Sequence, residues 1–256
     1  MLGVVRRCAI AAAMVLAVSC GGQKQPGPGG PPPNAKRVDS ATAGRVTGRV
    51  IFEGAPPANA AIKATSDQAC IDQNPNGVPS ENIVVDNGAL ENVFVYIKEG
   101  LGDYYFEVPA DPVKLDQRGC RFVPHVLGVR AGQPLTISNS DDAPHNVHAV
   151  PAVNPGFNRS QALKNMSDTK VFTKREVMIP FKCDIHPWMQ AYLGVMDHPY
   201  FAVTNDGGRF ELENLPPGTY TVEAWHEKLG TQTQQVTIAE KQSKAITFKF
   251  SGGAGL

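Results

Sequence analysis

The sequence predicts an all-β protein built from two β-sandwiches. Short apolar segments alternate with polar residues at a period of two, and glycine, proline and asparagine separate them at short intervals. The sequence shows no convincing amphipathic helical pattern, and 256 residues leave room for two small domains. Many short strands without helices are typical of β-sandwich folds.

The first 19 residues have the features of a secretory signal peptide. A basic start with two arginines precedes an apolar run at residues 8–18, which is too short to span a bilayer. Residues 16–20 resemble a bacterial lipobox, which implies cleavage before Cys20 and lipidation of that cysteine; an ordinary signal peptide cleaved nearby is the alternative. We therefore expect an exported protein in the periplasm, anchored to the outer membrane by its lipid.

The charge balance argues against a nucleic-acid partner. The chain has 24 basic and 24 acidic side chains, and removing residues 1–19 removes two arginines and no acid. The remaining chain is slightly acidic and lacks the positive charge that nucleic-acid binding needs. Residues 20–44 include a Pro/Gly-rich stretch that cannot form a core, so we expect an extended tether there.

The alternation of apolar residues places the expected strands after the tether. Residues 45–54 form the first strand, and residues 60–65 are its candidate partner. Asn87-Gly88 predicts a hairpin turn between strands at 82–85 and 92–97. The other expected elements are, in chain order, a loop at 70–80, strands at 121–129 and 135–139, and a short helix within 161–174.

The C-terminal part consists of strands and turns with two recognisable motifs. Thr204–Phe210 has the form T-x-x-x-G-x-F, and Leu215–Tyr220 has the form L-P-P-G-x-Y. With these motifs the segment resembles the carboxypeptidase regulatory-like, transthyretin-type β-sandwich. The resemblance implies a packing or adhesion unit and no peptidase activity.

This resemblance also implies the domain organisation. The family begins with a strand that only the region near residue 45 matches. We therefore expect a split sandwich at 45–66 and 199–250, with a second domain at 67–198 inserted between its parts. Two sandwiches in simple succession are the alternative.

Three cysteines remain after the leader and the lipidation candidate are set aside. Cys70, Cys120 and Cys183 would meet an oxidising compartment, where an odd thiol needs an explanation. The simplest pairing joins Cys70 to Cys120 and leaves Cys183 for a metal. Two unpaired thiols, or a transient pairing with Cys183, are the alternatives. A covalent haem is excluded because the chain has no C-x-x-C-H motif.

A set of soft donors indicates a copper centre. Cys183, His186 and Met189 have the spacing C-x2-H-x2-M, and His145 precedes Cys183 by 38 residues. Trigonal coordination by two histidines and one cysteine with a weak axial methionine is typical of single-electron copper sites. Zinc also binds cysteine and histidine, although a structural zinc site seldom uses methionine.

These motifs resemble the amicyanin family of cupredoxins, small blue-copper proteins. The shared residues are Pro144-His145-Asn146-Val147-His148 and the short loop Cys183-x-x-His186-Pro187-x-Met189. The resemblance implies a Greek-key β-sandwich over roughly 82–197 and one type-1 copper per chain. It also implies the individual roles: the copper ligands are His145, Cys183, His186 and Met189, Asn146 braces the loop, and His148 is near the site without being a ligand.

The remaining histidines are expected to have structural roles. His125 lies within a predicted strand, and packing is its default role. His198 and His226 lie at the junction with the C-terminal module, where packing is again the default and a second metal or proton site is the alternative.

The resulting functional prediction is electron transfer without enzymatic chemistry. His186 is expected to be the exposed exit for the electron, with Pro187 and Trp188 as an apolar rim. The family resemblance implies a periplasmic dehydrogenase as donor and a c-type cytochrome as acceptor. A copper-storage or delivery lipoprotein and a structural envelope protein without redox role are the alternatives.

Overall fold

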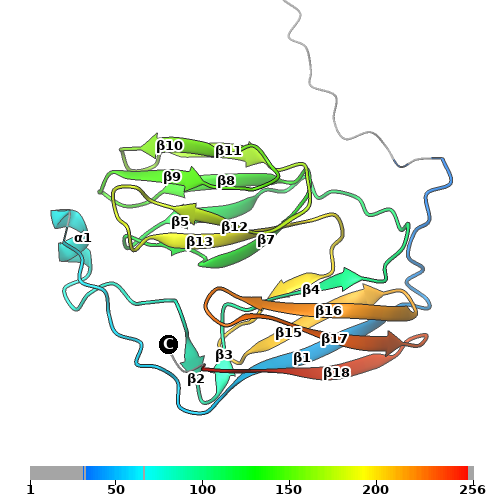
Figure 1. Cartoon of the computed structure of the whole chain (residues 1–256). Helices are drawn as coiled ribbons and strands as arrows, with labels where there is room; N and C mark the ends of the chain where they lie inside the picture. The colour runs from blue at the N-terminus through cyan, green and yellow to red at the C-terminus, as the bar shows by residue number, and fades with distance from the viewer. Residues whose placement is uncertain (1–30, 32, 66, 253–256) are drawn as a thin grey trace, which may run out of the picture. The chain divides into compact units, whose positions relative to one another are not determined.

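A computed structural model of the chain describes residues 31–252 apart from 32 and 66, and these residues form two β-sandwiches and one short helix (Figure 1). The predicted all-β class is confirmed. The signal peptide and Cys20 lie outside the described residues. Among the residues described, no helix is long and apolar enough to cross a membrane.

The first sandwich, which we call sandwich A, contains β5 to β13 in two sheets. One sheet has the strand order β10-β9-β12-β13-β7 and the other β11-β8-β5-β6. Pairs β13–β7 and β5–β8 are parallel and the other neighbours are antiparallel. The strands are β5 Val113–Gln117, β6 Phe122–Val123, β7 Val126–Arg130, β8 Pro134–Asn139, β9 His145–Ala149, β10 Phe157–Gln161, β11 Ser167–Val171, β12 Glu176–Lys182 and β13 Gln190–Met196.

The inward face of β8 shows how alternation builds this sandwich. Leu135 and Ile137 are buried in the core between the sheets, and the third inward residue, Asn139, is also fully buried. The Asn139 amide donates hydrogen bonds to the carbonyl oxygens of Ala143 and Gln161, at 3.0 and 2.9 Å. Because these bonds hold the loop after β8, they fix the start of β9.

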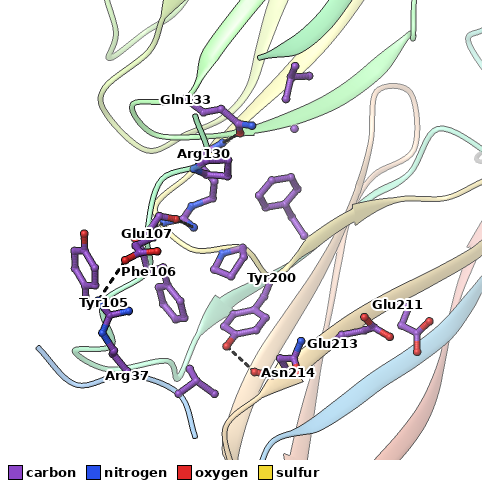
Figure 2. Close-up of a pocket in the computed structure, with 16 residues that line it drawn as sticks. Arg37, Tyr105, Phe106, Glu107, Arg130, Gln133, Tyr200, Glu211, Glu213 and Asn214 are labelled. Atoms are coloured by element: carbon purple, nitrogen blue, oxygen red, sulfur yellow. Dashed lines mark hydrogen bonds and ion pairs between the residues drawn. The ribbon is translucent and has the colours of Figure 1, made fainter. Parts of the chain in front are cut away.

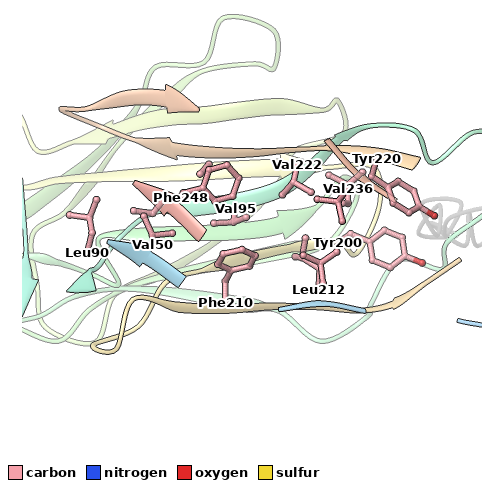
Figure 3. Close-up of a cluster of buried hydrophobic side chains, with 14 of the residues drawn as sticks. Val50, Leu90, Val95, Tyr200, Phe210, Leu212, Tyr220, Val222, Val236 and Phe248 are labelled. Atoms are coloured by element: carbon pink, nitrogen blue, oxygen red, sulfur yellow. The ribbon is translucent and has the colours of Figure 1, made fainter. Parts of the chain in front are cut away.

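The second sandwich, sandwich B, combines the first and last parts of the described chain. Its sheets have the orders β15-β1-β3-β2, with β18 also paired to β1, and β14-β4-β16-β17. Buried apolar side chains fill the space between them (Figure 3). The strands are β1 Gly44–Glu53, β2 Val85–Asp86, β3 Ala89–Leu90, β4 Phe94–Glu99, β14 Phe201–Val203, β15 Arg209–Leu215, β16 Gly218–His226, β17 Gly230–Ile238 and β18 Ser243–Ser251.

The strands at 85–99 belong to sandwich B, whereas the expected boundary grouped them with the inserted domain. β4 pairs with β14 and β16, and β3 pairs with β1. Residues 94–97 of β4 are buried on both faces because one face packs inside sandwich B and the other against sandwich A. The expected hairpin between 82–85 and 92–97 is therefore wrong, and the turn at Asn87-Gly88 joins only β2 to β3.

Three local expectations are also corrected. Ile62 pairs with Val78 rather than with β1. The expected loop at 70–80 begins within α1, Gln68–Gln73, whose N-cap Asp67 accepts a hydrogen bond from the backbone N–H of Ala69 at 2.8 Å. The expected helix within 161–174 is strand β11, which is polar because it is an exposed edge strand.

Candidate metal centre

The candidate histidines and Cys183 come together at one end of sandwich A. His145 is the first residue of β9, and Cys183 directly follows the last residue of β12. β9 and β12 are antiparallel neighbours, so the start of β9 lies opposite the loop after β12. His186 is in this loop, which leads to β13.

The donor atoms of these three side chains converge in a buried space. One nitrogen of each histidine and the sulfur of Cys183 all lie within 4.8 Å of one another. Nδ1 of His145 is 3.0 Å from Nδ1 of His186, and the Cys183 sulfur is 3.9 Å from that same His186 nitrogen. All three residues are at most 2% exposed.

Backbone and amide hydrogen bonds hold the β12–β13 loop. The Cys183 N–H donates to the Met189 carbonyl at 3.2 Å, and the Met189 N–H donates to the His186 carbonyl at 2.9 Å. The Asn146 amide oxygen accepts the Asp184 N–H at 2.6 Å and the Cys183 thiol at 3.3 Å. Asn146 thus has the contacts that a bracing role requires, and Met189 is buried in the same apolar cluster as Cys183.

Asp141 is a buried neighbour of the site that the sequence motifs do not indicate. Its carboxylate lies 3.0 Å from Nε2 of His145 and accepts the backbone N–H groups of Gly119 and Cys120, each at 2.8 Å. Burial by itself raises the pKa of Asp141, but the hydrogen bonds from His145 and these N–H groups lower it below its usual value. An ionised Asp141 accepts the Nε2–H of His145 and so holds the ring with Nδ1 facing His186.

The site favours the deprotonated form of Cys183. Burial raises the pKa of a thiol, but hydrogen bonds from His145 and His186 outweigh burial and lower the pKa of Cys183 to about 6. A thiolate is the form of cysteine that binds metals.

The structure corrects the expectation that His186 is exposed. His186 has no exposed surface. The Cys70 sulfur lies 3.8 Å from its Nε2, and the Trp188 ring centre lies 5.1 Å from its ring centre. The Trp188 indole N–H also donates to the Cys120 carbonyl at 3.0 Å. Trp188 and Cys70 therefore lie over His186, and together with Cys120 we call these residues the cover.

The cover over His186 includes the predicted disulfide. Cys70 is bonded to Cys120, and both are fully buried. Cys70 belongs to α1, and together with Ala64, Val78 and Ala143 the two cysteines form a small apolar cluster. Cys183 remains a free thiol, as the simplest pairing predicts.

His148 lies beside the centre and contacts a different group. Its Nδ1 is 2.9 Å from the Asp184 carboxylate, which also accepts hydrogen bonds from the amides of Asn146 and Asn158. Lys182 lies 3.3 Å from the same carboxylate. The His148 contact is the main cause that lowers the pKa of Asp184.

The other three histidines have local partners of their own. His125 contacts the Gln190 carbonyl and the Glu227 carboxylate, and Nε2 of His198 lies 2.8 Å from the Ile97 carbonyl. Nδ1 of His226 accepts two backbone N–H groups. Within the described part of the chain, none of the three belongs to a group of metal-donor side chains.

A separate cleft of about 830 Å³ is lined by both sandwiches (Figure 2). The guanidinium N–H groups of Arg130, in β7, donate hydrogen bonds to the carbonyl oxygens of Phe106, Glu107 and Asp197. Since these bonds tie β7 to the segments that connect the two sandwiches, we assign Arg130 a structural role. None of the candidate metal ligands lines the cleft.

A soft metal ion fits the donor set at the end of sandwich A. Ligands that surround one copper or zinc ion lie about 2.0–2.3 Å from it, which brings the ligands within about 4 Å of one another. A free thiol with a low pKa and two imidazoles that lie within 4.8 Å of it match this requirement with small adjustments. Both copper and zinc accept such ligands.

Comparisons with known proteins identify one module and several similar structures. Residues 194–251 match the family model described as a carboxypeptidase regulatory-like domain. No curated protein matches the chain. A copper-containing nitrite reductase from Thermus scotoductus is 22% identical with a TM-score of 0.33; the match covers 36% of this chain and 24% of the reductase.

Two small cupredoxins also match part of the chain. A purple cupredoxin from Nitrosopumilus maritimus is 19% identical with a TM-score of 0.29, over 33% of this chain and 99% of its own. A variant of amicyanin in the reduced state is 25% identical with a TM-score of 0.30, over 35% of this chain and 87% of its own. The chain thus contains a carboxypeptidase regulatory-like module at 194–251 and has weak structural similarity to cupredoxins.

Proposed function

We propose that the protein is a type-1 copper electron-transfer protein of the bacterial cell envelope. The observation that carries this proposal is the convergence of the Cys183 sulfur and the His145 and His186 nitrogens in one buried space. In this proposal these three side chains hold the copper ion and Met189 is the weak axial ligand. The bound ion would supply a one-electron Cu(II)/Cu(I) couple.

The surrounding residues would keep the ligands in place in both oxidation states. Asn146 holds Cys183 and the following backbone N–H, and Asp141 holds the His145 ring. The apolar core of sandwich A surrounds Cys183 and Met189 and excludes water from that side. Ligands that do not move when the charge changes suit electron transfer better than substrate chemistry, so the proposed protein is not an enzyme.

The partner is proposed to be another redox protein. The resemblance to amicyanin suggests a periplasmic dehydrogenase as electron donor and a c-type cytochrome as acceptor. Export and lipidation at Cys20 would place the protein in the periplasm at the outer membrane.

Copper spectroscopy of the purified chain tests the proposal. Cu(II) titration should give an intense red absorption band and the corresponding EPR spectrum at one copper per chain, because thiolate sulfur binds the ion directly. The band should disappear in Cys183→Ser and in His145→Gln. His148→Gln is the matched control and should keep the band, because His148 contacts Asp184 and is not one of the three converging donor side chains. A wild-type chain without the band would overturn the proposal.

A copper-handling function is the second candidate, and the burial of His186 favours it. An electron leaves a protein fastest through an exposed ligand, yet His186 is covered by Trp188 and the disulfide. A storage or delivery protein would bind Cu(I), show no intense band with Cu(II), and pass its copper to a Cu(I) chelator. Reversible voltammetry with retention of copper would instead favour electron transfer.

A further inference from the structure

We infer that Cys70 and Cys120, when their disulfide is reduced, form a second copper site that binds Cu(I) and shares His186 with the first. This inference goes beyond the proposed function, because the second site does not require Cys183. The second site lies in the cover, where each sulfur of the disulfide is close to a ring nitrogen of one of the two histidines.

The donor atoms around the disulfide carry the inference. The Cys70 sulfur is 3.8 Å from Nε2 of His186, which is the ring nitrogen that does not face Cys183. The Cys120 sulfur, an Asp141 carboxylate oxygen and a His145 nitrogen lie within 4.8 Å of one another. Each sulfur of the disulfide thus lies close to one imidazole, and the Cys120 sulfur also lies close to a carboxylate.

The distances match the ligand spacing of one small ion. Donors about 2.0–2.3 Å from an ion and about 120° apart lie roughly 3.5–4 Å from one another, and the Cys70–His186 distance of 3.8 Å falls in this range. The two sulfurs must also separate, which becomes possible when their bond is broken. Two thiolates and one imidazole are soft enough to select Cu(I).

The reduction step requires a dithiol as reductant. The dithiol supplies two electrons and two protons, its own sulfurs become a disulfide, and Cys70 and Cys120 become two thiols. Cu(I) then replaces the thiol protons, which pass to solvent. A thioredoxin-like dithiol protein is the class of partner that performs this exchange.

The cover is built so that reduction can loosen it. Besides the disulfide, the segment that carries α1 is attached by a hydrogen bond from the Asn74 amide to the Gly119 carbonyl at 3.2 Å. Glu81 adds an ion pair with Arg121 at 3.3 Å, and the apolar cluster around the sulfurs consists mainly of small residues. The disulfide is the covalent link among these contacts, so breaking it removes one constraint on the cover.

The shared histidine couples the two sites. A neutral His186 carries one N–H, so only one of its two ring nitrogens, Nδ1 near Cys183 or Nε2 near Cys70, is free to bind a metal ion. The redox state of the disulfide would therefore influence which copper ion His186 binds.

Cu(I) titration of the Cys183→Ser chain tests the inference independently of the first site. The chain is reduced anaerobically with dithiothreitol, the reductant is removed by gel filtration, and Cu(I) is added in competition with bicinchoninate. We expect one Cu(I) per chain in the reduced form and none in the oxidised form. X-ray absorption should show two sulfur ligands and one nitrogen ligand, with the chain monomeric.

Two controls separate a second site from other causes. The Cys70→Ser/Cys120→Ser/Cys183→Ser chain, and reduced Cys183→Ser chain with alkylated thiols, should bind no Cu(I) under the same competition; circular dichroism checks that each is folded. The inference is wrong if the reduced Cys183→Ser chain takes up no more Cu(I) than these controls, or if it binds Cu(I) only between two chains. If the wild-type chain shows no red band with Cu(II), only the proposed function is contradicted, because the second site is tested without Cys183.

Discussion

Asp141 links the candidate metal centre to the disulfide loop at the scale of single residues. Its carboxylate contacts His145 on one side and accepts the N–H groups of Gly119 and Cys120 on the other. Both sides contribute to its low pKa. A carboxylate behind a metal-binding histidine fixes the ring and increases its basicity.

Asp141→Asn should weaken copper binding by about 10–100-fold, which is the usual effect of removing such a partner. The amide has one acceptor oxygen and cannot satisfy Gly119, Cys120 and His145 together, so unfolding should also become easier by about 1–3 kcal/mol. Asp142→Asn is the matched control, because Asp142 is exposed and, among the described residues, pairs only with Lys164. Equal copper affinity in the two variants would refute the role of Asp141.

His226 predicts a pH dependence of stability. Burial lowers the pKa of His226 to about 4, whereas the unfolded chain keeps the usual histidine value of about 6.5. Below pH 6.5 the unfolded state binds a proton that the folded state does not, so this residue lowers stability as the pH falls toward 4. Between pH 7 and pH 5 the loss is about 2 kcal/mol.

His226→Asn should remove this contribution, because asparagine does not titrate and its oxygen can accept the same two N–H groups. Urea unfolding at pH 7 and pH 5 measures the difference. The variant should lose about 2 kcal/mol less than wild type between the two pH values. The same pH sensitivity in both proteins would show that another group causes it.

At the scale of elements, two glycines make room for the contact between the sandwiches. Gly128 of β7 and Gly194 of β13 are opposite each other in their parallel pair. The Phe94 ring of β4 lies against both, and Phe201 lies against Gly128. The glycines thus form a hollow in the sheet that receives an aromatic side chain of the other sandwich.

Gly194→Ala should destabilise the protein by about 1–3 kcal/mol. A Cβ at this position would lie 2.5 Å from Cζ of Phe94 and 2.8 Å from Cε of Met178, and both residues are buried. The control is Gly207→Ala, whose Cβ would have its nearest neighbours at 3.5 Å. Thermal unfolding should show a lower midpoint for the first variant only; a wild-type midpoint would mean that the ring moves aside without cost.

The sequence predicted elements well where one face of a strand is buried and less well elsewhere. The alternation at 135–139 identified β8, and the motif spacing brought His145, Cys183 and His186 together as candidates. β4 was grouped with the wrong sandwich because a strand buried on both faces has no alternation to show its partner. β11 has almost no apolar residues, and α1 is a six-residue helix that depends on its cap and the disulfide.

The candidate metal centre, too, could be predicted from the sequence only in part. Ligand spacing is visible in a sequence, but the burial of His186 and the carboxylate of Asp141 follow from contacts with Cys70, Gly119 and Cys120, which are distant in the chain. Only the folded arrangement brings these groups to the centre.

At the scale of the whole molecule, the matched module depends on residues outside its own sequence. β1 lies between β15 and β18, and β4 lies between β14 and β16. Both β1 and β4 precede the segment 194–251 that matches the family model.

A fragment of residues 194–252 should therefore not fold alone. Without β1 the strands β15 and β18 lose their common neighbour, and without β4 the strand β16 loses one of its two neighbours. Circular dichroism and a proton–nitrogen NMR spectrum should show a disordered fragment, with the full chain as control. A dispersed spectrum from the fragment would show that the module supplies its own central strands.

The parallel pairing of β1 with β18 also has a consequence for biogenesis. Glu53 and Lys249 form an ion pair across these strands although they are 196 positions apart in the sequence. Contacts of such long range form slowly, because the intervening chain must first be closed into a loop. A chain that folds as it is synthesised would complete sandwich A first, and β1 would remain without β18 until the last strand is made. Premature termination near the C-terminus would then leave an unpaired edge open to proteases and chaperones.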